Sequence, residues 1–192
     1  GLQNLSTMTG SLGIYQNPIL PNLIGLTALS SIGGDLIVSE NPNFGGFTGL
    51  ANLTEIKGTI SLTSLPQMST MANLVPVNDT ITSISLVDCN GLTNLIGFTN
   101  IPCVKNDINI VSCNNLENLN GLSKIDTLRG NLVLNKLAKL SSFSGLNGVK
   151  YMKKDFRLSE CNNLTGLNGF TLLDSIGGNF VVQDNQSLYN FS

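Results

Sequence analysis

The chain has 192 residues, of which 41% are hydrophobic and only 11% are charged, and it contains neither His nor Trp. Its formal net charge of −2 lacks the basic excess of nucleic-acid-binding proteins, so we predict no nucleic-acid partner. No apolar run reaches the length of about 18 residues that spans a bilayer, so we predict no membrane span. The absence of His removes the commonest general base and most zinc and haem ligands, so we predict no cofactor and no metal site.

A repeat of 24 residues organises the whole chain. It is clearest in SSIGGDLIVSENPNF at 30–44 and DSIGGNFVVQDNQSL at 174–188, which lie six repeats apart. Residues 1–192 therefore form one domain without insertions or deletions, and its repeats start near residues 3, 27, 51, 75, 99, 123, 147 and 171. Positions 3, 6, 10, 12, 18, 21 and 24 of the repeat are apolar in 55 of 56 cases, and Thr80 at position 6 is the exception.

Each repeat predicts one short strand followed by turns. Positions 10 and 12 are apolar between polar neighbours, which is the period of a half-buried strand. From position 15 onward the apolar spacing is three, and Gly occupies position 23 in seven copies, as in a chain that turns around a core. One coil cannot bury its own apolar side, so we predict eight stacked coils, about 38 Å long, with a parallel sheet and little or no α-helix.

The pattern L-x-I-x-x-N-x-x-L, with the trailing L-x-G-L, resembles leucine-rich repeats. The preceding I-x-G-x-L makes it similar to the receptor L-domain family in particular, and the resemblance covers the whole chain. It implies an all-β, right-handed parallel β-solenoid on a cell surface. Receptor L domains usually have irregular coils and cysteine-bearing ends, and this chain departs from both features.

Six N-x-S/T sequons indicate a secreted glycoprotein. Five are predicted to carry N-linked glycans, namely Asn4, Asn52, Asn78, Asn163 and Asn190. The sixth, Asn185, lies at position 15, which we expect to face inward and to bond the backbone of the next coil, so it should not carry sugar. We therefore predict an extracellular or cell-surface location.

The four cysteines give no clear disulfide pattern. Cys89 and Cys113 share position 15 on consecutive coils, where their Cα atoms would lie about 4.8 Å apart. That spacing permits a disulfide, but the parallel side chains favour two buried free thiols. Cys161 is two coils further and has no partner in this column. Cys103 is predicted to face outward, where it either pairs with another chain or stays inert.

Basic residues line one column of the repeat. Lys105, Arg129 and Lys153 occupy position 7 of consecutive coils, about 5 Å apart. Such a column repels itself unless anions lie nearby, so either Asp107, Asp126 and Asp155 neutralise it or it binds an anionic partner.

Enzymatic and ice-binding functions are poorly supported. Glycan-cleaving solenoids need clustered carboxylates in a groove, whereas the twelve acidic residues here are scattered. A flat ladder of outward Thr is interrupted, as at Arg157. We predict no catalytic residues and no enzymatic activity.

The ends of the chain are in phase with the repeat. Gly1 and Leu2 occupy positions 23 and 24, whereas Phe191 and Ser192 occupy positions 21 and 22. Joining the end to the beginning completes a coil, so we predict that copies continue end to end, either as a covalent array or by non-covalent stacking. The predicted function is a structural repeat module of an extracellular fibre or surface array. The alternative is a recognition ectodomain that binds a glycan or a protein along one face.

Overall fold

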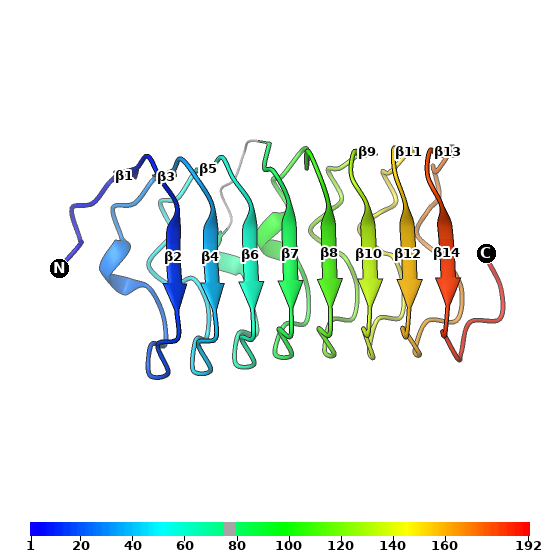
Figure 1. Ribbon diagram of the computed structural model, residues 1–192, viewed down its shortest axis with the longest axis horizontal. Helices are drawn as coiled ribbons and strands as arrows, with labels where there is room; N and C mark the ends of the chain where they lie inside the picture. Colours follow the sequence, from blue (N-terminus) through cyan, green and yellow to red (C-terminus); the bar gives the residue numbers. More distant parts are fainter. Residues whose placement is uncertain (75–79) are drawn as a thin grey trace.

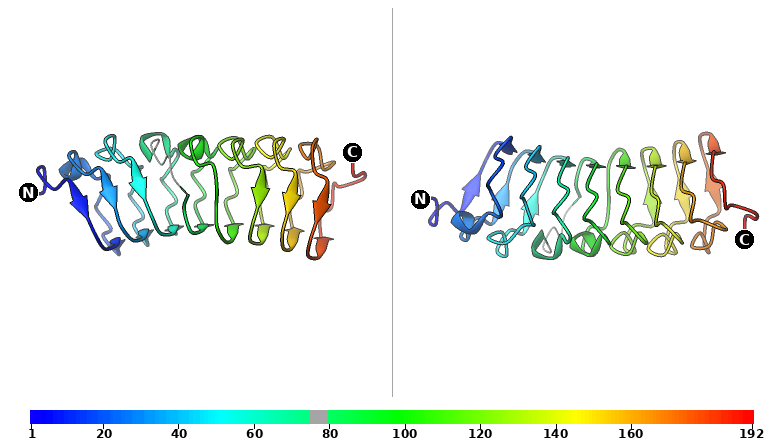
Figure 2. Two further views of the ribbon diagram at one scale, coloured as in Figure 1. Left: turned by 90° about the horizontal axis from the view of Figure 1, so that it is seen from above. Right: turned by 90° about the horizontal axis from the view of Figure 1, so that it is seen from below.

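The computed structural model, which describes residues 1–74 and 80–192, is an all-β parallel solenoid. Its coils stack in single file, and the two termini lie at opposite ends (Figure 1; Figure 2). Within the described residues, helical structure is limited to three short 3-10 helices: η1 Ile24–Leu26, η2 Ala72–Leu74 and η3 Ile96–Phe98. The fold class predicted from the repeat is confirmed.

One eight-stranded sheet forms a full side of the solenoid (Figure 1). Its strands are β2 Leu12–Tyr15, β4 Leu36–Ser39, β6 Ile60–Thr63, β7 Ile84–Val87, β8 Ile108–Val111, β10 Leu132–Asn135, β12 Phe156–Ser159 and β14 Phe180–Gln183. Every neighbouring pair is parallel, and each residue is paired with the residue 24 positions along the chain. The sheet therefore has the spacing of the sequence repeat at all seven junctions.

Two three-stranded sheets of short strands lie just before the large-sheet strands, one in the first three coils and one in the last three. One contains β1 Thr7–Met8, β3 Ser31–Ile32 and β5 Glu55–Ile56, and the other β9 Thr127–Leu128, β11 Tyr151–Met152 and β13 Ser175–Ile176. Between them, Ile81 forms an isolated parallel bridge with Val104. The sequence pattern did not predict these two-residue strands.

The bridge at Ile81 corrects the prediction of an uninterrupted 24-residue register. Ile81 accepts a hydrogen bond from Lys105 N at 3.0 Å, as position-6 residues do in other coils, and its side chain is fully buried. Thr82 N then donates to Gly58 O at 2.9 Å, which restores the usual register. Compared with the other coils, this coil thus has one additional residue before the position-6 site, which Ile81 occupies, and lacks one residue between that site and position 8. The shift explains why Thr80 interrupted an otherwise apolar column.

The core is a continuous stack of apolar columns inside the coils. Leu86, Ile110 and Leu134, all at position 12, have no exposed surface, as the alternation predicted. Toward the C-terminal end the core becomes aromatic: Phe156 packs on Phe180 with ring centroids 5.1 Å apart. Because each column continues from coil to coil, burial of a residue depends on the coils on both sides of it.

The residue after each large-sheet strand, at position 14, adopts a left-handed conformation. All eight are non-glycine residues with φ between 54° and 56°: Gln16, Glu40, Ser64, Asp88, Ser112, Lys136, Glu160 and Asp184. This conformation costs roughly 1–2 kcal/mol per non-glycine residue. In the first six coils its backbone amide bonds the next coil, for example Lys136 N to Ser159 O at 3.1 Å. Glu160 and Asp184 adopt the same φ, so the turn is a constant feature of the coil, and stacking adds a hydrogen bond to it in six coils.

Candidate functional site

The N-terminal end of the solenoid presents an open apolar face. Its hollow has a volume of about 340 Å³ and is lined almost entirely by side chains from the first coil, including Leu5, Met8, Leu12, Ile14 and Leu20. These residues belong to the columns that are sealed in interior coils. Here they are only half-buried, and Leu2 beside them is 58% exposed.

The C-terminal end presents a matching face built on the last coil. A hollow of about 430 Å³ is lined by Leu167, Phe170, Leu173, Phe180 and Phe191, among others. Phe180 is 43% exposed and Phe191 is 69% exposed, although both occupy columns that are buried elsewhere. The two ends together thus expose the cross-section of the core.

The side chains of Asn41 and Asn185 at position 15 bond the backbone of the preceding coil. The prediction of a bond to the next coil was wrong. Asn41 Oδ1 accepts a hydrogen bond from Asn17 N at 2.8 Å, and Asn41 Nδ2 donates to Ile14 O at 3.0 Å. Asn185 repeats both contacts, with Cys161 N at 2.8 Å and Leu158 O at 3.2 Å. An asparagine at this position therefore ties two coils together through two backbone groups.

The three cysteines of the same column are buried free thiols, so the structure does not contain the Cys89–Cys113 disulfide that the spacing permitted. Their S–H groups point at the carbonyl pair that asparagine uses; Cys89 Sγ lies 3.5 Å from Leu62 O and 3.6 Å from Val87 O. The hydrogen bond with Cys113 and burial raise the pKa of the Cys89 thiol, and burial raises the pKa of Cys161 to about 11. These two thiols are protonated at neutral pH and are poor nucleophiles. Cys103 is free and half-buried.

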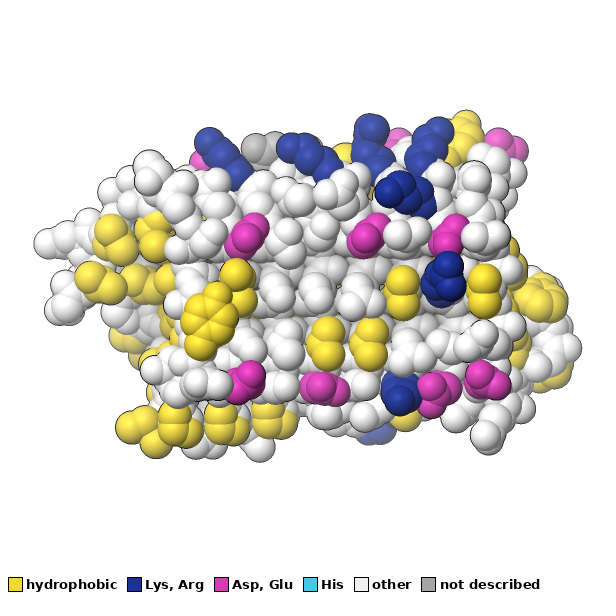
Figure 3. Space-filling model, viewed as in Figure 1, with side chains coloured by type: hydrophobic (Ala, Val, Ile, Leu, Met, Phe, Trp, Pro, Cys, Tyr) yellow, Lys and Arg dark blue, Asp and Glu magenta, His cyan; other side chains and the backbone are white. Residues whose placement is uncertain are grey.

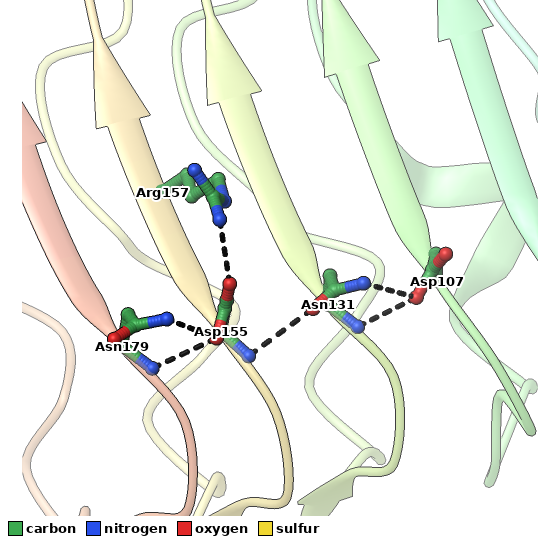
Figure 4. A network of polar contacts seen from close by, with 5 residues as sticks. All are labelled: Asp107, Asn131, Asp155, Arg157 and Asn179. Atoms are coloured by element: carbon green, nitrogen blue, oxygen red, sulfur yellow. Dashed lines mark hydrogen bonds and ion pairs between the residues drawn. The ribbon is translucent and has the colours of Figure 1, made fainter.

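Polar side chains at position 9 form a ladder that was not foreseen from the sequence (Figure 4). Asp107 Oδ1 accepts from Asn131 N at 2.7 Å, Asn131 Oδ1 accepts from Asp155 N at 3.2 Å, and Asp155 Oδ1 accepts from Asn179 N at 2.8 Å. The amide of Asn179 and the guanidinium of Arg157 lower the pKa of the Asp155 carboxyl. The signal was present in the sequence, because position 9 carries Ser, Thr, Asn or Asp in all eight repeats.

The basic column predicted at position 7 is exposed on all three coils. Basic side chains gather along the upper edge of the large-sheet face in Figure 3. Among the described residues, Lys105, Arg129 and Lys153 form no ion pair within 4.0 Å, and Lys153 lies 5.3 Å from the ring centre of Tyr151. Asp107 and Asp155 instead belong to the position-9 ladder, so ion pairing with these carboxylates does not neutralise the column.

The sequons differ in their surroundings. Asn4, Asn52 and Asn163 are exposed, and Asn190 is half-buried. Asn52 Nδ2 donates to Thr27 O at 2.7 Å, and Asn190 Oδ1 accepts from Ser192 N at 3.0 Å. Asn185 Nδ2 is engaged by two carbonyls, as its predicted inward orientation required. Asn78 lies outside the described residues.

The chain has no recognised relative, and its described residues offer no metal site. No known family matches the chain, and neither a curated protein nor a solved structure is significantly similar to it. Residues 1–74 and 80–192 contain no group of three or more His, Cys, Asp or Glu side chains placed to hold a metal ion. No helix in this described part is long and apolar enough to cross a bilayer.

Proposed function

We propose that this chain is a non-enzymatic structural module that continues end to end with copies of itself in an extracellular fibre or surface array. One observation supports the proposal most: the two ends of the solenoid expose the same columns that every interior coil seals. Leu12 at one end and Phe180 at the other both occupy position 10, which is fully buried in most of the coils between them. Covering such surface is worth about 25 cal/mol per Å², and only another coil of this shape covers it column by column.

The ends also meet in sequence phase. Placing Leu188–Ser192 before Gly1–Leu2 gives L-x-x-F-x-G-L, which has the apolar spacing of the segments that close the coils within the chain, six of seven of which also have Gly at position 23. Phe191 and Leu2 would fill positions 21 and 24 of the completed coil. The contact is head to tail, so it is heterologous and extends indefinitely instead of closing. Covalent arrays and stacked separate chains use the same contact.

A relationship to leucine-rich repeats and receptor L domains belongs to this proposal. Its support is the repeat pattern and a parallel solenoid with one long sheet. The absence of an enzymatic role also remains a proposal. It is supported by a chain without His and by carboxylates that are engaged in coil-to-coil hydrogen bonds.

Assembly of the purified 192-residue chain tests the proposal. Sedimentation velocity at rising concentration is expected to show open-ended polymers. Phe180→Lys should prevent them, because its side chain is already 43% exposed in a single copy but would be buried at a junction. Tyr189→Lys is the matched control, since Tyr189 is 79% exposed on the same coil in an outward column. A chain that stays monomeric at high concentration, or equal effects of both variants, would contradict end-to-end stacking.

The extracellular location is proposed from the sequons. Asn4 and Asn52 are exposed, in the first and the third coil. Glycopeptide mass spectrometry of native material should find N-linked sugar on Asn4 and Asn52 and none on Asn185, whose amide is held by two carbonyls. Unmodified Asn4 and Asn52 would remove the support for a secreted glycoprotein.

A second candidate function is recognition of an anionic partner along the basic column. The exposure of Lys105, Arg129 and Lys153 without ion pairs favours it. Binding of a sulfated oligosaccharide should weaken when Arg129 and Lys153 are replaced by Gln, and should fall steeply with salt. Replacing Lys136 and Lys139, which lie elsewhere on the coils, serves as the control. Equal losses in both pairs would mean nonspecific attraction.

A further inference from the structure

The junctions between coils share a fixed set of backbone hydrogen bonds. At each of the seven junctions, the amide at position 10 donates to the carbonyl at position 9 of the next coil, as Leu132 N does to Asp155 O at 2.9 Å. An asparagine at position 15 adds two further bonds to the coil before it. These rules allow the unfilled groups at each end of the solenoid to be identified.

Asn17 is an asparagine of this kind without a preceding coil. Its Nδ2 keeps the bond within its own coil, to Tyr15 O at 2.8 Å, as Asn41 and Asn185 also do. The two bonds that Asn41 makes to the coil before it have no equivalent in Asn17, because β2 is the terminal strand of the sheet. Asn17 therefore presents one amide hydrogen and its Oδ1 to the space beyond the first coil.

The last coil presents the two groups that such an asparagine binds. By equivalence with Ile14 and Leu158, the carbonyl of Val182 faces the space beyond β14, the terminal strand at the other end. By equivalence with Asn17 and Cys161, the amide of Asn185 faces the same way. Among the described residues, the backbone N–H of Asn185 has no hydrogen-bond acceptor, unlike its side-chain Nδ2.

We infer that the C-terminal edge binds the N-terminal edge of a second copy, and that Asn17 closes this junction by donating to Val182 O and accepting from Asn185 N. This inference rests on the proposed end-to-end function, and it names the hydrogen bonds that would align one copy on the next. A second contact follows from the position-9 ladder. Asn179 Oδ1 would accept from Ser11 N of the other copy, as Asn131 Oδ1 accepts from Asp155 N.

The distribution of residue types at position 15 supports the same junction. Five consecutive coils use Leu or Cys there, and Asn occurs only at Asn17, Asn41 and Asn185. Leu makes neither bond, and the Cys thiols lie 3.4–4.0 Å from their carbonyls, which is weak bonding. The junction between copies therefore has Asn at position 15, which bonds the neighbouring coil more strongly than the Cys found at three of the interior coils.

A tandem protein tests the inference, with Ser192 of one copy joined directly to Gly1 of the next. Asn17→Ala in the second copy removes the asparagine at the internal junction. The same substitution in the first copy lies at a free end and is the matched control. We expect the internal variant to lower the equilibrium constant for folding by at least about tenfold. The free-end variant should lower it by less than about twofold.

Amide exchange gives a second readout. With only the first copy isotopically labelled, the Asn185 amide should be protected in the tandem, and the internal Asn17→Ala variant should accelerate its exchange by about tenfold or more. A tandem more stable than a single copy but indifferent to Asn17 at either place would overturn the asparagine junction and leave end-to-end stacking intact. A tandem whose halves unfold independently, with stability equal to one copy, would overturn both.

Discussion

Interior and terminal coils are built from the same columns but have different burial. At position 12, Leu134 and its interior equivalents are fully buried, whereas Ile14 in the first coil and Val182 in the last are half-buried. The residue types do not explain the difference, because all are aliphatic. The number of neighbouring coils does. Stability in this molecule thus belongs mainly to the junctions between coils, and a coil at an end has one junction instead of two.

An introduced charge at position 12 should destabilise an interior coil much more than a terminal coil, and this is the largest difference that we expect. Leu134→Asp places an unpaired carboxylate between two coils and is expected to lower the free energy of unfolding by about 3–5 kcal/mol. Ile14→Asp at the equivalent position of the first coil should cost less than half as much, because its side chain reaches solvent. Urea unfolding followed by circular dichroism measures both. Equal losses would show that burial is not set by neighbouring coils.

Glycine at position 23 provides a second, smaller contrast. Gly121 has φ +127°, and a Cβ there would overlap the carbonyl oxygen of Leu95 in the preceding coil. Gly25, in the first coil, would have nothing within 4 Å of its Cβ. Gly121→Ala should therefore cost about 2–3 kcal/mol, and Gly25→Ala less than about 0.5 kcal/mol. The comparison fails if Gly25→Ala destabilises the protein as much in the same urea titration.

Alkaline pH should weaken the interior through its buried thiols. Burial raises the pKa of Cys161 from 9.0 to about 11. Between these values the unfolded chain loses this proton while the folded chain retains it, so the stabilisation is complete below pH 9 and is lost as pH rises through 11. The expected loss is at most about 3 kcal/mol. Cys161→Ala should remove this part of the pH dependence, and an unchanged slope in that variant would contradict the assignment.

The repeat predicted most of the fold because its 24-residue spacing specifies which residues of consecutive coils lie side by side. Apolar columns 24 residues apart determine which strands pair and which side chains are buried, and Leu36 and Leu134 needed no further information. The shift at Ile81 was hidden because one added residue and one missing residue cancel within a single coil. The left-handed residues, such as Ser112 and Lys136, were hidden because they are not glycine, the residue that usually marks a positive φ.

The candidate sites were harder to predict than the fold. The sequence placed the basic column correctly but could not show that Asp107 and Asp155 would bond backbone amides of the next coil rather than Lys105 or Arg129. It also placed Asn41 on the inward column but assigned its backbone partner to the wrong neighbour. In both cases the outcome depends on side-chain direction between coils, which column composition does not specify.

Electron cryo-microscopy of assembled material can test our claim that copies continue one another through their ends. We predict filaments with an axial repeat of about 38 Å. In them β14 of one copy should pair with β2 of the next in parallel, at the same spacing of about 4.8 Å as the strands within a copy. Filaments in which copies meet through their sides, or no filaments at concentrations where the ends should be occupied, would contradict the claim.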